Sequence, residues 1–173
     1  MDHPYRRRRA RVRRALQEAG ADAAVAYPGP NLQYFTGFRG EPVDRFHVLY
    51  IPADGKATLI TPEGYLTQAN RNATVESVNT VPSNDPGQVA DAIADFAGPD
   101  PRSVLVDDDA LHAVTGPLYD RLGTDAVECA GPLFRSLRRR TDDAETAAMK
   151  RSAEVADAVS AEVRSSETDA VGM

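Results

Sequence analysis

The feature of this sequence that most limits its fold is a series of short apolar runs separated by polar and turn-forming residues. Runs of four to six residues are short for helices and typical of buried strands. The strongest are 23–27 (AAVAY), 46–51 (FHVLYI), 57–61 (ATLIT) and 103–106 (SVLV), with weaker ones at 74–78 and 126–129. The sequence therefore predicts a sheet whose strands are spread along most of the chain.

Helical patterns alternate with these runs. They cover residues 5–19, 62–70, 86–96, 110–122 and a short stretch ending near Arg138. Alternating helices and strands are typical of an α/β fold. The turn Pro52-Ala53-Asp54-Gly55 carries an Asp-Gly hairpin signal, so at least one strand pair is antiparallel and the sheet is expected to be mixed. Pro28, Gly29 and Pro30 end the first run, and a loop-rich stretch is predicted after them.

The end of the chain has a different character. Thr141 is a suitable N-cap for a long helix through about Arg164, and Asp142 and Asp143 follow where a helix dipole favours acids. Ala and Val recur there at helical spacing, with no later element to pack against. We therefore predict two parts, a domain in residues 1–140 and, in residues 141–173, a linker helix with the start of a missing domain. The apolar stripe of this helix is expected to pack against something outside the 1–140 domain.

The charge is unevenly distributed. The net charge is −6, yet seven of the eighteen arginines lie between Arg6 and Arg14. An acidic surface rich in Asp suits a salt-rich cytoplasm, which indicates a halophilic source. The lone Cys129 fits a reducing compartment, and no apolar run is long enough for a membrane helix or a secretory signal. We expect a cytoplasmic protein with no membrane partner.

Two segments carry a family resemblance. Asn31-Leu32-Gln33-Tyr34-Phe35-Thr36-Gly37-Phe38 resembles the Asn-x-x-Tyr-[Leu/Phe]-Thr-Gly-Phe segment of the creatinase and Xaa-Pro peptidase family, which includes prolidase and aminopeptidase P. Leu137-Arg138-Arg139-Arg140-Thr141 is similar to the family's junction Leu-Arg-x-x-Lys-[Ser/Thr], with Arg140 in the place of Lys. The order and spacing of the two segments also match the family.

The resemblance implies a fold and a role. It implies a mixed six-stranded sheet flanked by helices, with a ribonuclease-H-like arrangement, in front of a catalytic domain that binds two divalent metals of the manganese or cobalt type. The five metal ligands, two Asp, one His and two Glu, would all lie in that second domain, so no catalytic or metal residue is assigned here. The chain is expected to be non-catalytic, to form a homodimer, and to shape access for a proline-containing peptide in an aminopeptidase or dipeptidase. A creatinase-like amidinohydrolase remains an alternative parent.

The segment after the first strand is the expected access loop. The resemblance assigns it Asn31, Tyr34, Thr36, Gly37, Phe38 and Arg39. Structurally, Asn31 and Thr36 could bond an irregular backbone, Tyr34 and Phe38 could anchor it, and Gly37 permits a positive φ. If this loop borders the catalytic cleft of the parent protein, the charged residues at the rim of that cleft would be Arg39, Glu41, Asp44 and Arg45.

Other residues have competing interpretations. Asp107, Asp108, Asp109 and His112 could form a metal site after a strand, or a turn with an Asp N-cap on a helix near Ala110. The arginine-rich helix could bind nucleic acid in an independent binding module, or it could show its arginines to solvent beside an acidic body.

His3 lies near the terminus and His47 alternates with apolar neighbours on a strand. Cys129 is predicted to be a small buried residue, since nothing in the sequence supplies it with a base.

Overall fold

The computed structural model describes residues 4–39 and 46–171, with side chains described as far as Arg164. The chain divides into two compact units, one that ends at Arg138 and one that begins at Arg139. The first unit contains the sheet and the second consists mainly of one long helix. No helix in the described ranges is both long enough and apolar enough to cross a membrane.

The elements of the first unit follow the predicted alternation closely. Its helices are α1 (Pro4–Ala19), α2 (Pro30–Thr36), α3 (Leu66–Asn72), α4 (Pro86–Ala97), α5 (His112–Leu122) and α6 (Gly131–Arg138). Its strands are β1 (Ala23–Ala26), β2 (Val48–Pro52), β3 (Thr58–Pro62), β4 (Ser77–Val81), β5 (Val104–Val106) and β6 (Val127–Cys129). Two 3₁₀ turns, η1 (Glu63–Tyr65) and η2 (Thr124–Ala126), precede α3 and β6.

The six strands form one mixed sheet in the order β4-β3-β2-β1-β5-β6. β2 pairs antiparallel with both β1 and β3, whereas β3–β4, β1–β5 and β5–β6 are parallel. The β2–β3 hairpin turns at Asp54-Gly55, where Gly55 has a φ of 110° that L side chains rarely adopt. The predicted α/β class, the mixed six-stranded sheet and the hairpin are all confirmed.

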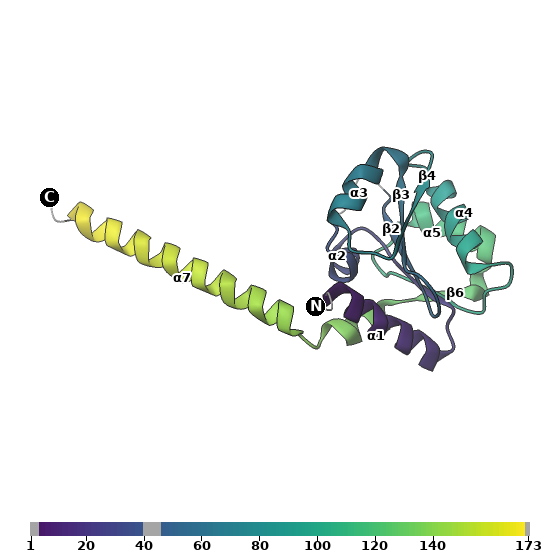
Figure 1. Ribbon diagram of the computed structural model, residues 1–173, viewed down its shortest axis with the longest axis horizontal. Coiled ribbons are helices and arrows are strands. Elements are labelled where there is room, and N and C mark those ends of the chain that lie inside the picture. Colours follow the sequence, from purple (N-terminus) through teal and green to yellow (C-terminus); the bar gives the residue numbers. More distant parts are fainter. Residues whose placement is uncertain (1–3, 40–45, 172–173) are drawn as a thin grey trace. The chain divides into compact units, whose positions relative to one another are not determined.

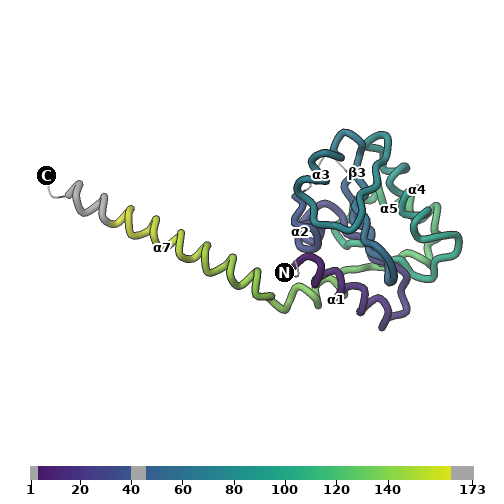
Figure 2. The backbone as a smooth tube through the Cα atoms, viewed as in Figure 1, coloured from purple at the N-terminus to yellow at the C-terminus, as the bar shows by residue number. Residues whose placement is uncertain are grey.

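Side chains alternate along the strands and make two cores, one under each of the helical layers that Figure 1 shows on the two faces of the sheet. Ala24 and Ala26 of β1 face a cluster that includes residues of α1, α2, α3 and α6, while Ala23 and Val25 face a cluster with α4 and α5. β1 is buried at every position because it lies inside the sheet with a helical layer on each face. Figure 2 traces the chain from α1 through β1 directly into α2.

Two local predictions were wrong. Residues 30–36 form the helix α2 rather than a loop, because Pro30 occupies its first position, where a missing N–H costs no helical hydrogen bond. Helix α5 begins at His112 instead of near Ala110, and its N-cap residue Leu111 makes no side-chain cap, so the predicted Asp cap is absent.

The second unit contains α7 (Asp143–Val171). The residue that caps it is Asp142, not Thr141: its carboxylate accepts from the Glu145 amide at 2.9 Å, and Glu145 accepts from the Asp142 amide at 3.0 Å. This reciprocal capping box fixes where the helix begins. Met149, Val155, Val159 and Val163 are each more than half exposed and are spaced as on one side of a helix.

Candidate functional site

Helix α2 and the residues after it form the candidate site. Gly37 ends the helix in the left-handed conformation, with φ 76°, and its amide donates to the carbonyl of Gln33 at 2.8 Å. The hydroxyl of Thr36 donates to the Leu32 carbonyl at 2.6 Å and accepts from the Phe38 amide at 3.0 Å. Gly37 and Thr36 therefore turn the chain sharply towards Phe38.

The remaining carbonyls at the end of α2 are bound by groups from other elements. Arg8 donates to the Tyr34 carbonyl at 2.9 Å, and Arg9 donates to the Phe35 carbonyl at 2.7 Å. The amide of Thr74 donates to the carbonyl of Thr36 at 2.8 Å. Carbonyls at a helix end lack intrahelical partners and carry partial negative charge, so two guanidinium groups stabilise this end both as donors and as cations.

Arg9 also ties α2 to the chain before β4. It is 1% exposed, and it donates to the Thr74 carbonyl at 2.6 Å and to Glu76 at 2.7 Å. Glu76 further accepts from Arg13 at 3.2 Å and from the Ala57 amide at 3.0 Å. Desolvation is the largest influence on the pKa of Glu76 and acts to raise it, but Arg9, Arg13 and the amide together lower that pKa below its usual value. Glu76 is therefore held as a carboxylate.

The start of α2 is joined to two other elements by Asn31. Its side-chain amide donates to Asp107 at 2.9 Å, and its oxygen accepts from Arg138 at 3.1 Å. Asp107 follows β5 and also accepts from the Tyr27 amide at 3.3 Å. Desolvation, the main cause, raises the pKa of the buried Asp107 despite these hydrogen bonds. Both ends of α2 are thus fixed by charged side chains from distant parts of the sequence.

The six residues predicted for the access segment lie together on α2 and just beyond it. Asn31, Tyr34, Thr36 and Phe38 are buried, and Phe38 packs edge-on against His47 at 5.0 Å between ring centroids. The Tyr34 ring lies 4.1 Å beneath the guanidinium of Arg8, in a cation–π contact. Arg39 is exposed. The other predicted rim residues Glu41, Asp44 and Arg45 fall outside the described residues, as does His3.

Gly37 has a second reason to be glycine. A Cβ built on it would lie 2.7 Å from the ring of Tyr5 in α1. The positive φ and this close approach both exclude a larger side chain. Tyr5 and Gly37 thereby set how closely the start of α1 approaches the end of α2.

The three aspartates after β5 have separate surroundings. Asp107 bonds inward to Asn31, whereas Asp108 lies on the other side and accepts from Cys129 and Arg135, each at 2.6 Å. The hydrogen bond from Cys129 is the largest influence that lowers the pKa of Asp108, and the same bond chiefly raises the pKa of the thiol. Cys129 is exposed because β6 is an edge strand, so the prediction that it is buried was wrong. Within the described ranges, no three His, Cys, Asp or Glu side chains form a group suited to a metal ion.

Sequence reasoning missed the roles of Arg8 and Arg9. The predicted helix was expected to show its arginines to solvent, yet Arg8 is 7% and Arg9 1% exposed. A signal was present: positions 8 and 9 fall between Tyr5 and Val12 at the helical spacing that continues to Leu16. The buried stripe of α1 therefore passes through two cations, which a pattern of apolar residues alone does not reveal.

Comparison with known proteins gives the class of this fold. Residues 8–140 match the family model described as the creatinase/prolidase N-terminal domain. The chain belongs to this family of amino-terminal domains, as the two sequence segments predicted.

Individual relatives agree with that assignment. The probable dipeptidase PepE of Mycobacterium tuberculosis is 31% identical over 165 residues, which cover 92% of this chain and 42% of the relative. The crystal structure of dipeptidase PepE from Mycobacterium ulcerans superposes with a TM-score of 0.73 at 28% identity, covering 92% of this chain and 43% of that one. A recombinant prolidase from Thermococcus sibiricus shares the fold, with a TM-score of 0.75 at 24% identity over 94% of this chain and 44% of that one. The chain spans less than half the length of each of these proteins.

Proposed function

We propose that this chain is the non-catalytic amino-terminal domain of a metal-dependent dipeptidase or aminopeptidase that cleaves Xaa-Pro bonds. The observation that carries the proposal is the family match over residues 8–140 together with coverage of only 42% of the dipeptidase relative. In this proposal the parent protein has a second, catalytic domain, and the domain described here shapes access to it and contributes to a homodimer.

The described side chains of the chain do not fit a pair of divalent ions. Hydrolysis with two metals needs several carboxylates and imidazoles that converge on ions about 4 Å apart. In the described residues the carboxylates after β5 diverge, and no suitable group is found elsewhere. We therefore assign the metal pair, of the manganese or cobalt type, to the second domain, and no chemical step to this one.

The access role rests on how the segment from Asn31 to Arg39 is held. Its buried residues are fixed at both ends of α2 by Arg8, Arg9 and Asp107. Arg39 follows directly and is exposed. A segment with a rigid base and an exposed charged end can limit the length of a peptide without changing shape itself.

A direct test uses the purified chain with manganese and an Xaa-Pro dipeptide. We expect no hydrolysis above the rate without protein. Hydrolysis that disappears on changing Asp107 or His112 would overturn the proposal, because it would place the metal chemistry in this chain. The coding sequence after Met173 gives an independent check, since a continuing frame should supply two Asp, one His and two Glu in family order.

The access role is tested in the complete protein encoded by that frame. Arg39→Ala should change KM for tripeptide and longer substrates more than KM for dipeptides, with kcat on dipeptides retained. Arg7→Ala, which removes an exposed arginine from α1, is the matched control and should leave both values unchanged. Equal effects of the two variants on every substrate would contradict a role for Arg39 in access.

Nucleic-acid binding by the arginine-rich helix is the alternative from another class. It loses two of its cations, because Arg8 and Arg9 are buried against α2. We expect weak binding of labelled DNA that is lost as salt increases, without dependence on Arg8 or Arg9. A creatinase-like amidinohydrolase is separated from a peptidase by assaying the complete protein on creatine and on an Xaa-Pro dipeptide.

Homodimer formation, a cytoplasmic location and adaptation to high salt are parts of the same proposal. The acidic composition supports the last, with 26 acids against 20 Lys and Arg. Unfolding measured at low and at multimolar potassium chloride tests it: the unfolding free energy should rise with salt. Light scattering on the complete protein tests the dimer, and a monomer at micromolar concentration would contradict it.

A further inference from the structure

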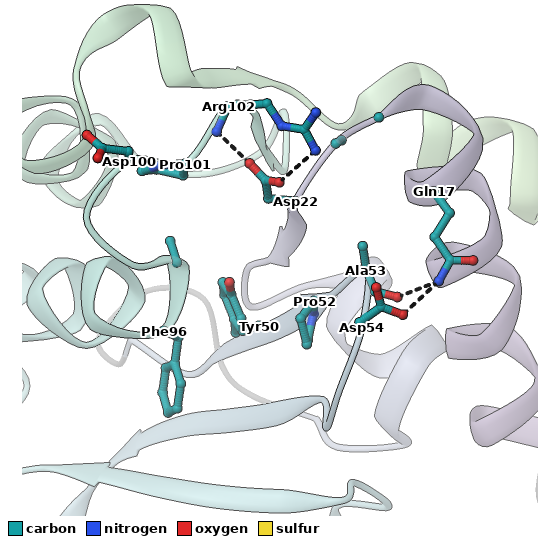
Figure 3. Close-up of a pocket in the computed structure, with 13 residues that line it drawn as sticks. Gln17, Asp22, Tyr50, Pro52, Ala53, Asp54, Phe96, Asp100, Pro101 and Arg102 are labelled. Atoms are coloured by element: carbon teal, nitrogen blue, oxygen red, sulfur yellow. Dashed lines mark hydrogen bonds and ion pairs between the residues drawn. The ribbon is translucent and has the colours of Figure 1, made fainter.

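A hollow of about 470 Å³ lies where α1 ends and β1 begins. The polar and aromatic residues that line it come from α1, β2, α4 and the connections after them: Gln17, Asp22, Tyr50 of β2, Asp54 of the following turn, Phe96 of α4 and Asp100 beyond α4 (Figure 3). β1 starts at this hollow and leads away from it to α2, so the hollow is separate from the access segment. Its volume is in the range of small-molecule sites, about 300–1,000 Å³.

Tyr50 is the first sign of a ligand. The residue is only 4% exposed, and its hydroxyl forms no hydrogen bond with any residue that the structure describes. In Figure 3 the hydroxyl points into the hollow, between Phe96 and Asp22. Burial, with a further contribution from the charge of Asp22, raises the pKa of Tyr50 to about 12. The hydroxyl oxygen is not among the buried atoms without a partner, so it is open to the hollow, where a ligand can supply the hydrogen bond that the described residues do not.

The charge of the hollow is the second sign. Asp22, Asp54 and Asp100 line it together with one base, Arg102, whose side chain is 79% exposed. One oxygen of Asp22 accepts the amides of Arg102 and Ser103 at 2.5 and 3.1 Å, while the other lies 3.6 Å from the guanidinium of Arg102. Asp54 accepts one hydrogen bond, from Gln17 at 3.0 Å. Oxygen acceptors therefore outnumber donors around the space.

An aromatic wall completes the arrangement. The ring of Phe96 stacks on that of Tyr50, with centroids 5.5 Å apart and an angle of 25° between the planes. Phe96 is 43% exposed, so part of its side chain is available to a ligand. Aromatic faces attract cations, and carboxylates beside them supply hydrogen-bond acceptors.

We propose that this hollow binds a small organic cation, a primary alkylammonium or a guanidinium, with its charged head held by the acidic lining of the space. The hydroxyl of Tyr50 accepts a hydrogen bond from the cation, and the alkyl part lies against Phe96. This site goes beyond the access function and does not depend on it, because it uses none of the residues from Asn31 to Arg39.

The test is a titration of the purified chain with agmatine, followed by amide chemical shifts in NMR spectra. Agmatine carries both an ammonium and a guanidinium group. We expect saturable shifts at Gly20, Ala21 and Ala53, which line the hollow, and none at Thr36 or Gly37. A neutral alkylurea of similar length is the ligand control and should cause no saturable shift. Absence of saturation with agmatine, or shifts spread over the acidic surface, would overturn the proposal.

Variants separate the hollow from the general acidic surface. Asp54→Asn combined with Asp100→Asn should weaken agmatine binding about fivefold, and Tyr50→Phe by a similar factor. Asp95→Asn is the matched control: it removes an exposed charge from α4 next to Phe96 without lining the hollow, and binding should be retained. An equal loss in the control would show ordinary counter-ion attraction and contradict the site.

A second ligand distinguishes free cations from protein side chains. A capped tripeptide with a central arginine is titrated in the same way. Saturation by agmatine alone assigns the hollow to free cations, and saturation by the peptide as well assigns it to basic side chains of a protein. Failure of both ligands to bind would exclude the site.

Discussion

Two polar regions of the domain differ in how their buried groups are satisfied. In the arginine network, formed by Arg8, Arg9 and Glu76 with the carbonyls at the end of α2, cations and acceptors are paired within the protein. In the hollow, the hydroxyl of Tyr50 has no partner in the described part of the chain and is open to the space, which acidic groups also line. The first arrangement is expected of a scaffold and the second of a binding site.

In this domain, neither burial nor a high density of charge is enough to mark a binding site. The arginines of the network are more deeply buried than the charged groups around the hollow, and the carbonyls of Tyr34, Phe35 and Thr36 at the end of α2 each accept a hydrogen bond from the protein. The Nε–H of Arg9 is buried without a partner among the described residues, whereas Nη1 of the same guanidinium donates to the carbonyls of Phe35 and Thr74. A dense group of charges is therefore no sign of a site unless some of them remain available.

The largest expected effect is the loss of Arg9. Arg9→Leu should lower the free energy of unfolding by about 3 kcal/mol, because it removes the Arg9 donor from the buried Phe35 carbonyl, from the part-buried Thr74 carbonyl and from Glu76. Urea unfolding measures it. Arg7→Leu, at an exposed position of the same helix, should change stability by less than about 0.5 kcal/mol. If the two variants were equal, the arginine network would have no structural role.

Gly37→Ala should cost about 2 kcal/mol, through its positive φ and through contact with Tyr5. Gly20→Ala separates the two causes, since Gly20 has a similar φ of 69° and nothing within 4 Å of an added Cβ. That control should cost only about 1 kcal/mol. Thermal unfolding of both variants is the measurement, and a larger loss at Gly20 would contradict the close approach of Tyr5.

Glu76→Gln should lower stability by about 1–2 kcal/mol at neutral pH. Because the folded pKa of Glu76 lies below its ordinary 4.5, its contribution is fully present above that value and is lost as pH falls through the folded pKa. The difference between wild type and variant should therefore shrink towards zero in acid. Unfolding free energies over a series of pH values test this, and a difference that grows in acid would contradict the pairing with Arg9.

Tyr50→Phe should have the smallest effect on stability, within about 0.5 kcal/mol, because the hydroxyl that it removes bonds no described residue. The same variant should weaken binding of agmatine. Urea unfolding without ligand provides the measurement. A loss above about 1 kcal/mol would mean that the hydroxyl has a structural partner, and the contrast between the two regions would fail.

Most of the fold could be predicted because its signals are local. The Asp54-Gly55 turn, the apolar run of β5 and the periodic pattern of α4 each lie within a few residues. Helix α2 was missed because Pro28, Gly29 and Pro30 are typical of a loop and because seven residues are too few to show a period. Tertiary contacts from Arg8 and Arg9, rather than propensity, stabilise it.

The candidate site was predictable only in part, since resemblance located the segment but not its supports. Asp107 was considered as a metal ligand or a helix cap, and its actual partner Asn31 lies 76 positions away in the sequence. No local pattern reports such a pairing. The exposure of Cys129 depends on β6 being an edge strand, which is a property of strand order and not of the residues in β6.

Strand order also has a consequence for synthesis on the ribosome. β1, β2 and β3 form consecutive antiparallel pairs and emerge early, but the other edge of β1 pairs with β5, which emerges only with residues 104–106. Until then the most buried strand of the finished domain has one row of backbone groups open to any other strand. A nascent chain halted before Val104 is therefore expected to aggregate, whereas one released after Cys129 has every strand it needs to close the sheet.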